Sequence, residues 1–155
     1  MASPSWGQQN PPPADGATVR IAGQVTHPLL LHETDLLTMK RTTVNTTDER
    51  GEAAKYEGVP IVELLQRAGA PLGKELRGPN MKLYVVAKAA DGYQVVFALP
   101  EFDPGFTDRV ILLADRRDGH ALSPREGPFR VVVPGEKRHA RWIREVSTLE
   151  VLQAP

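Results

Sequence analysis

Apolar and polar residues alternate along several short stretches of the chain, which is the pattern of half-buried β-strands. The first stretch is Thr18–Val25, and a second, Lys40–Thr47, is rich in β-branched residues. Short uninterrupted apolar runs predict further, more deeply buried strands. The pattern predicts about eight or nine strands in total. The remaining strands are expected at Leu29–Leu31, Glu52–Glu57, Leu83–Ala89, Tyr93–Leu99, Arg109–Ala114, Phe129–Val133 and Glu145–Leu152.

Helical spacing of apolar residues is clearest after Gly58. Pro60 suits the first position of this helix, where its missing N–H is no loss, and Gly69 can end the helix. The apolar face consists of Ile61, Leu64, Leu65 and Ala68.

A shorter helix is predicted to run through Met39, with Glu33 or Thr34 as its cap. Leu36 and Leu37 are expected to face inward. Strands outnumber helices and do not alternate regularly with them. The predicted fold class is therefore α+β with a mixed sheet.

Two Asp-Gly pairs predict turns between strands. Asp91-Gly92 joins two predicted strands into a hairpin. This pair supplies the positive φ angles that a type I′ turn requires. Asp118-Gly119 is expected to form a second turn.

Composition narrows the function classes. Lys and Arg total 19, as do Asp and Glu, so there is no basic surplus of the kind that general nucleic-acid binding needs. The absence of cysteine excludes disulfides and thiolate metal sites. No stretch reaches the roughly 20 apolar residues of a membrane span. Residues 1–16 are rich in Pro, Gln, Asn and Ser and lack the apolar core of a signal peptide. We expect a disordered tail at 1–16 and one domain over 17–155.

A basic loop follows the apolar run Phe129–Val133. Pro134-Gly135 ends this strand, and four basic residues come within the next six positions: Lys137, Arg138, His139 and Arg141. Cations held at the end of a buried strand suit an anion such as phosphate. The alternative is an ordinary basic loop that binds only water and counterions.

Several segments, in their order and spacing, resemble the molybdopterin-binding domain of the sulfite oxidase family of oxidoreductases. They are Tyr56-Glu57-Gly58-Val59-Pro60-Ile61 with Leu64-Leu65 and Ala68-Gly69, Ala90-Asp91-Gly92-Tyr93, Val110–Ala114 with Asp118-Gly119, and Gly127–Gly135 with Trp142-Ile143. The resemblance covers roughly Thr18–Leu152. It implies an α+β fold of mixed β-sheets with flanking short helices, and a pocket that holds the pterin's phosphate and ring through basic and backbone groups. It also implies a bacterial protein exported to the periplasm or secreted, with the signal peptide not present in this sequence.

The chain departs from the family at the metal. Family enzymes carry a molybdenum-binding cysteine a dozen or so residues before the Gly-Val-Pro element, where this chain has Val44-Asn45-Thr46-Thr47. Threonine and asparagine are neutral, hard ligands and poor substitutes for a thiolate. From the length of the sequence, we expect neither the heme domain nor the dimerisation domain of larger family members. No metal ligand or catalytic residue is predicted.

The resemblance implies cofactor contacts at seven positions. They are Asn45, Thr46, Tyr93, Lys137, Arg138, His139 and Arg141. The spacing within the basic loop differs from the family's spaced lysines. Each residue also has a structural interpretation: Tyr93 can simply pack at the start of a strand, and His139 can be a plain surface histidine.

Other charged clusters are interpreted as solvated surface. Glu101, Asp103 and Asp108 cluster in one loop, and the favoured interpretation is a solvated acidic loop. The alternative is acid–base chemistry by paired carboxylates. Arg116-Arg117, beside Asp115 and Asp118, is expected to be a solvated turn.

Three functions remain open. The first is a module that binds a pterin-like or other anionic small molecule, or a partner protein. The second is an oxidoreductase that holds molybdopterin through the pterin alone, with oxygen ligands to the metal from solvent or Thr46. The third is a structural protein whose pocket is vestigial. Whether the chain is an enzyme stays undecided at this level.

Overall fold

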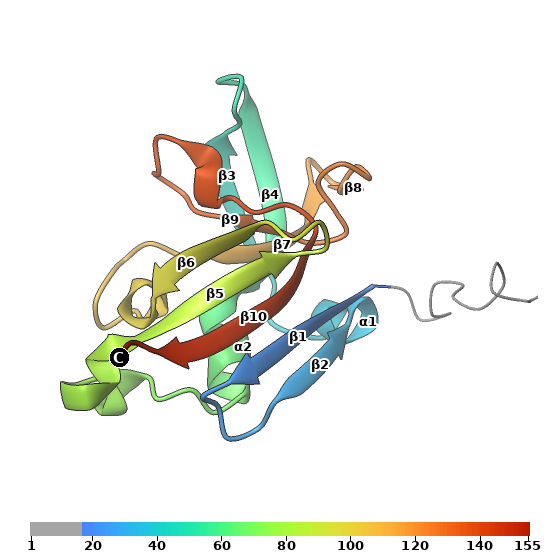
Figure 1. Ribbon diagram of the computed structural model, residues 1–155. Coiled ribbons are helices and arrows are strands. Elements are labelled where there is room, and N and C mark those ends of the chain that lie inside the picture. Colours follow the sequence, from blue (N-terminus) through green and yellow to red (C-terminus); the bar gives the residue numbers. More distant parts are fainter. Residues whose placement is uncertain (1–16) are drawn as a thin grey trace, which may run out of the picture.

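A computed structural model describes residues 17–155, which form two β-sheets with a few short helices (Figure 1). The first sheet has the order β2-β1-β10-β5-β6. Its strands are β1 (Thr18–Gly23), β2 (Leu29–His32), β5 (Leu83–Ala89), β6 (Gln94–Ala98) and β10 (Val146–Gln153). Within it, β1 runs parallel to β10 and the other pairs are antiparallel, so the sheet is mixed as predicted. The disordered tail predicted for residues 1–16 lies outside the described residues.

The second sheet has the order β3-β4-β7-β8, with β9 also paired to β7. Its strands are β3 (Thr42–Thr47), β4 (Ala53–Pro60), β7 (Leu112–Arg117), β8 (His120–Ala121) and β9 (Arg130–Val132). The helices are α1 (Glu33–Leu37) and α2 (Ile61–Arg67), with short 3₁₀ turns η2 (Gly73–Glu75), η3 (Gly78–Lys82), η4 (Leu99–Phe102) and η5 (His139–Arg141). The predicted α+β class is confirmed.

One cluster of buried apolar residues joins the two sheets and α2. Alternating residues of β1, such as Val19 and Ile21, are fully buried, as the alternation of the sequence predicts. The predicted face of α2 is buried as well, and Gly69 follows it with a φ of 80°, a left-handed conformation that suits glycine.

The two helix starts differ from the predictions. Pro60 is the last residue of β4 and has extended geometry, with a ψ of 132°, so α2 begins at Ile61. His32, rather than Glu33 or Thr34, precedes α1. Its backbone N–H donates to the Asp35 carboxylate at 2.8 Å.

Leu37 does not face inward. Its side chain is 54% exposed, whereas the neighbouring Leu36 is buried. A helix of five residues covers little more than one turn, so it presents only a narrow face to the core.

The type I′ turn predicted at the first Asp-Gly pair is found at the second pair instead. Gly92 has a φ of 94°, but Asp91 is not among the residues with positive φ, so the β5–β6 turn is not type I′. Ala89 and Tyr93 close a three-residue loop instead, through a hydrogen bond of 2.9 Å. At Asp118-Gly119 both φ angles are positive, 51° and 84°, which is the type I′ requirement.

Candidate functional site

The connection from β9 to β10 forms a loop whose two ends are joined by a backbone hydrogen bond. The Val131 N–H donates to the carbonyl of Ile143 at 3.0 Å, so the two ends of the loop lie side by side. Pro134-Gly135 turns the chain, with a Gly135 φ of 83° and a hydrogen bond from the Glu136 N–H to the Val133 carbonyl at 3.3 Å. Proline followed by a positive-φ glycine is the sequence of a type II turn.

This loop and the β3–β4 turn line an open cavity of about 780 Å³, which we call the loop cavity. Its lining residues are Thr46, Thr47, Asp48, Glu49, Gly51, Gly135, Glu136, Lys137, Arg138 and His139. It therefore brings together two segments that are about 90 positions apart in the sequence.

All three carboxylates of the loop cavity are paired with arginines, two of them from other strands and one from the same loop. Asp48 pairs with Arg117 at 2.7 Å. Glu49 pairs with Arg130, and Glu136 pairs with Arg141 at 2.7 Å. The hydrogen bond from Arg117 lowers the pKa of Asp48 to about 2. The negative charge of the three carboxylates is thus largely compensated.

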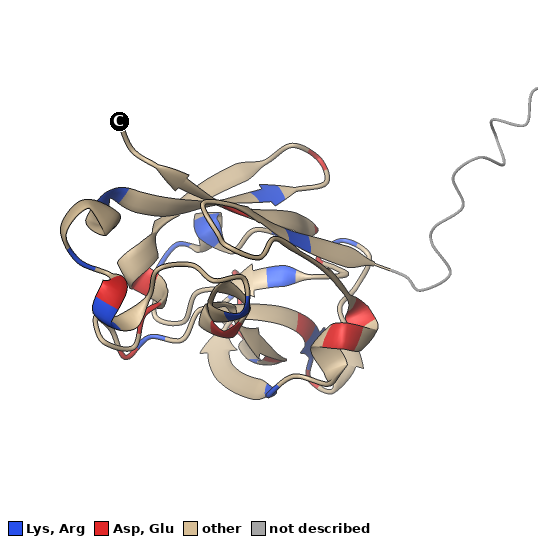
Figure 2. Cartoon of the chain, turned by 90° about the horizontal axis from the view of Figure 1, so that it is seen from below, with Lys and Arg blue, Asp and Glu red and all other residues tan. Residues whose placement is uncertain are grey.

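The two cations of the cavity rim have no such partners. Lys137 and Arg138 are exposed, and neither makes an ion pair or side-chain hydrogen bond with residues 17–155. Over the ribbon as a whole, basic and acidic positions are interspersed rather than gathered on opposite faces (Figure 2). The loop cavity is a local site of uncompensated positive charge on a chain without net charge.

A buried arginine lies behind the cavity. The Arg130 side chain is 1% exposed and pairs with both Glu126 and Glu49. It also donates to the Tyr56 hydroxyl at 3.2 Å and to the Trp142 carbonyl at 3.2 Å. Burial lowers the pKa of Arg130, but the hydrogen bond with Glu49 and the surrounding negative charge raise it overall, so the guanidinium is permanently charged.

A second cavity of about 350 Å³ adjoins the first, and we call it the tryptophan cavity. Its lining residues are Glu49, Ala89, Asp91, Tyr93, Arg130, His139, Ala140, Trp142, Ile143 and Arg144. The rings of His139 and Trp142 stack, with centroids 3.6 Å apart and planes inclined by 8°. His139 Nδ1 and Trp142 Nε1 are both buried, and neither has a hydrogen-bond partner among the described residues.

Four of the seven predicted cofactor residues meet at the loop cavity. They are Thr46, Lys137, Arg138 and His139. Tyr93 lines the tryptophan cavity together with His139, and its hydroxyl donates to the Ala140 carbonyl at 2.8 Å. Asn45 lines neither cavity; it is exposed on β3, opposite Lys55 of β4.

Arg141 lines neither cavity. Its guanidinium pairs with Glu101 at 3.0 Å and with Glu136 at 2.7 Å. It also lies over the Phe97 ring, 4.4 Å from the centroid. These contacts hold the loop against the β5–β6 hairpin.

Two acidic groups interpreted as solvated are buried. Asp103 is 3% exposed and accepts hydrogen bonds from the backbone N–H groups of Gly73 and Gly105, both at 2.7 Å. Asp115 accepts two hydrogen bonds from Arg41, at 2.9 and 2.5 Å. The solvated-surface prediction is wrong for both residues. The partner of Asp115 is distant in the sequence, and the partners of Asp103 are backbone N–H groups.

Sequence reasoning missed the Arg130 network. The signal was present, because Arg130 interrupts the apolar run Phe129–Val133. A charge inside a buried strand requires a buried partner. That partner set, Glu126, Glu49 and Tyr56, comes from three separate segments and cannot be read from spacing.

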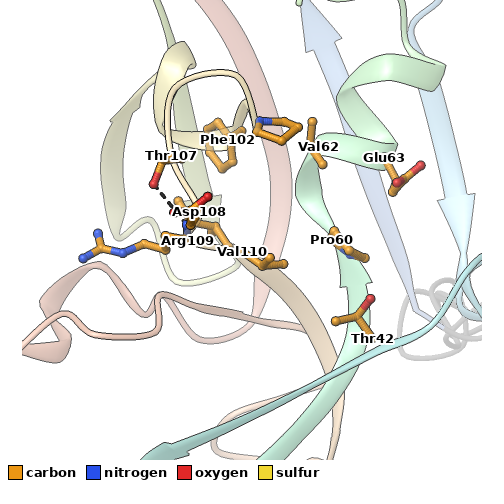
Figure 3. Close-up of a pocket in the computed structure, with 11 residues that line it drawn as sticks. Thr42, Pro60, Val62, Glu63, Phe102, Thr107, Asp108, Arg109 and Val110 are labelled. Carbon is orange, nitrogen blue, oxygen red and sulfur yellow. Dashed lines mark hydrogen bonds between the residues drawn. The ribbon is translucent and has the colours of Figure 1, made fainter. Parts of the chain in front are cut away.

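A third cavity, of about 310 Å³, lies between the start of α2 and the segment 102–111 (Figure 3). Its walls include Pro60, Val62 and Phe102, and the Arg109 side chain points away from it (Figure 3). None of the seven predicted residues lines this cavity, so we do not place the candidate site there.

The residues at the two cavities do not fit a thiolate-held metal. The whole chain contains no cysteine, and residues 17–155 contain no group of three or more His, Asp or Glu side chains that could hold a metal ion. The same residues do offer groups for an anion: two unpaired cations and two unpartnered buried ring nitrogens. Among residues 17–155, no helix has both the length and the apolar character needed to cross a membrane.

Comparison with known proteins gives the family and the fold of this chain. The family model described as "oxidoreductase molybdopterin binding domain" matches residues 9–155, so the chain belongs to that family. A comparison with curated proteins gives no match.

A solved structure has the same fold. It is the sulfane dehydrogenase SoxCD from Paracoccus pantotrophus, which superimposes with a TM-score of 0.71 at 23% sequence identity. The match covers 90% of this chain and 39% of the SoxCD chain. The sulfite-oxidase-type fold implied by the resemblance is confirmed.

Proposed function

We propose that the chain is a binding module for molybdopterin, or for an anionic small molecule of similar size, and that it holds the ligand in the loop cavity. The supporting observation is the uncompensated charge of Lys137 and Arg138 beside carboxylates that other arginines already engage. A phosphate-bearing ligand fits such a rim, because charge-assisted hydrogen bonds to phosphate are among the stronger ones.

In this proposal the ligand is held through its organic and phosphate portions. Molybdopterin would supply redox chemistry at a bound molybdenum, but the chain has no thiolate with which to ligate that metal. The residues that would hold the cofactor are those on the two sides of the loop cavity, with Thr46 on β3 and Lys137, Arg138 and His139 on the loop.

The test is purification from a host that makes molybdenum cofactor, followed by measurement of bound pterin and metal. The parent should retain pterin. The double variant Lys137→Ala/Arg138→Ala should lose at least about tenfold in occupancy, because each substitution removes a charged donor from the rim. It should also keep the parent's melting temperature, since neither side chain has an ion pair or hydrogen bond with residues 17–155 to lose.

A matched control removes the same two residue types elsewhere. Lys74 and Arg77 are exposed, line neither cavity and make no ion pair with residues 17–155. Lys74→Ala/Arg77→Ala should leave pterin occupancy unchanged. A parent protein that carries no pterin and takes none up, or a control variant that loses as much as the rim variant, would overturn the proposal.

An oxidoreductase without a thiolate ligand is the second candidate. The observation in its favour is that Thr46 lines the same cavity as the rim cations, so an oxygen ligand is within the proposed site. Molybdenum in a one-to-one ratio with pterin, lost in Thr46→Val, would favour this candidate. Pterin without metal would favour the binding module, and an empty protein would favour a vestigial pocket.

We also propose that the protein functions in the bacterial periplasm or outside the cell. The support is the sequence resemblance, which implies a family whose bacterial members are often exported. Fractionation of the source cells, with a cytoplasmic marker followed alongside, tests it. Recovery with the cytoplasmic marker would contradict it. A protein partner is a further proposal, tested by whether a distinct subunit copurifies with the chain from those cells.

A further inference from the structure

A carboxylate of the chain itself lies where the two cavities meet. Glu49 lines both the loop cavity and the tryptophan cavity, and so does His139. The Glu49 carboxylate accepts hydrogen bonds from Arg130 and, at 3.4 Å, from Arg144. Its Oε1 lies 3.9 Å from His139 Nδ1. One side-chain carboxylate thus sits among three basic groups.

The side chains around Glu49 include hydrogen-bonding groups that the Glu49 carboxylate does not engage. Trp142 is 2% exposed and the His139 side chain is 10% exposed, yet Trp142 Nε1 and His139 Nδ1 have no hydrogen-bond partner in residues 17–155. Buried ring nitrogens of this kind are normally paired, because an unmade hydrogen bond costs free energy. Both residues line the tryptophan cavity beside Arg130.

We infer that Arg130, Arg144, His139 and Trp142 form an anion-binding subsite, and that Glu49 occupies it as an internal competitor. An anionic group of a ligand, a phosphate or a carboxylate, takes the place of the Glu49 carboxylate and gains the two unpartnered ring nitrogens. The inference rests on the proposed function, since the ligand that enters is the one held at the adjoining rim.

The fold allows Glu49 to leave. Glu49 lies on the turn between β3 and β4, and its side chain is 38% exposed, so it can rotate into solvent. Arg130 keeps a carboxylate when Glu49 withdraws, because Glu126 pairs with the same guanidinium and is only 13% exposed. The buried cation is therefore not left uncompensated during the exchange.

Inorganic phosphate is the probe for the subsite, with affinity measured by titration. Glu49→Ala should bind phosphate at least about tenfold more tightly than the parent, because the competing charge-assisted hydrogen bonds are gone. Glu52→Ala is the matched control. Glu52 lies on the same turn, is exposed and makes no ion pair with the described residues, so its removal changes the net charge equally without opening the subsite.

The indole N–H resonance of Trp142 locates the binding. The chain has two tryptophans, and a Trp6→Phe background assigns the signal. Phosphate should shift this resonance in Glu49→Ala at concentrations that leave the parent unchanged. Adding Arg144→Ala to Glu49→Ala should abolish the gain, since it removes a donor of the subsite whose side chain is 42% exposed.

Three outcomes overturn the inference. They are equal affinity of Glu49→Ala and parent, an equal gain in Glu52→Ala, and a gain without movement of the Trp142 resonance. Should Glu49→Ala unfold, Glu49→Gln keeps the shape of the side chain while removing its charge, and the same comparison applies. Failure of the rim proposal shows separately, as unchanged pterin occupancy in Lys137→Ala/Arg138→Ala.

Discussion

The basic residues at the rim of the 134–142 loop and at its base differ in burial and in pairing. At the rim, Lys137 and Arg138 are exposed and make no ion pair within the described part of the chain. At the base, Arg130 is buried and bound by two carboxylates, a hydroxyl and a carbonyl. The comparison separates two uses of positive charge: the base holds the loop in place, and the rim is left with charge to offer a ligand.

The largest effect that tests this division is expected from Arg130→Met. Methionine matches the length of the side chain but leaves Glu126 and the Tyr56 hydroxyl without their buried partner. Breaking a buried pair in this way costs about 3–5 kcal/mol. Urea unfolding measures the loss, and a decrease below about 1 kcal/mol would show that the base does not depend on Arg130.

A smaller effect is expected from Arg141→Ala. Arg141 pairs with Glu101 and Glu136 and lies over Phe97, but its side chain is 29% exposed, so solvent screens part of the interaction. The expected loss is roughly 1–2 kcal/mol. Arg138→Ala is the control, three positions earlier in the same loop, and should stay within about 0.5 kcal/mol of the parent. Equal losses of unfolding free energy in the two variants would show that Arg141 does not hold the loop more firmly than Arg138 does.

The smallest effect concerns acid stability. Burial raises the pKa of Glu49, but hydrogen bonding to Arg130 outweighs it, and the net result is a decrease from 4.5 to about 2. The unfolded chain therefore binds the proton more readily, so this stabilisation is complete above about pH 4.5 and is lost as the pH falls toward 2. Because the Glu49 side chain is 38% exposed, the contribution is about 1 kcal/mol or less.

Unfolding curves between pH 6 and pH 2 measure this contribution. Glu49→Gln should lose less stability over that interval than the parent, because it has no carboxylate to protonate. Glu52→Gln, on the same turn, should follow the parent. An acid response of Glu49→Gln identical to that of the parent would contradict the assignment of the pair.

The fold was largely predictable from local patterns. Alternation located β1 and β3, and apolar spacing located α2, because these elements bury one face against a common core. The errors concern features decided by a few atoms. The choice of type I′ turn depends on whether the backbone of Asp91 or Asp118 takes a positive φ, and both pairs read Asp-Gly.

The site was predictable only in part. The rim cations follow one another after Gly135, so their shared cavity could be anticipated from the sequence. Arg141 belongs to the same run, yet its partners Phe97, on β6, and Glu101, on η4, lie about 40 positions earlier. The pairing of Glu49 with Arg130 spans 81 positions. Such contacts depend on how the sheets pack, and no spacing rule contains them.

The position of β10 has a consequence for biosynthesis. This last strand lies in the middle of its sheet, between β1 and β5. A ribosome therefore releases the β1–β2 and β5–β6 hairpins long before the strand that joins them, and each hairpin meanwhile exposes an open edge. Open edges invite pairing with other chains. Until Gln153 has left the exit tunnel, both hairpins keep these open edges, and chaperone demand should persist until β10 has emerged.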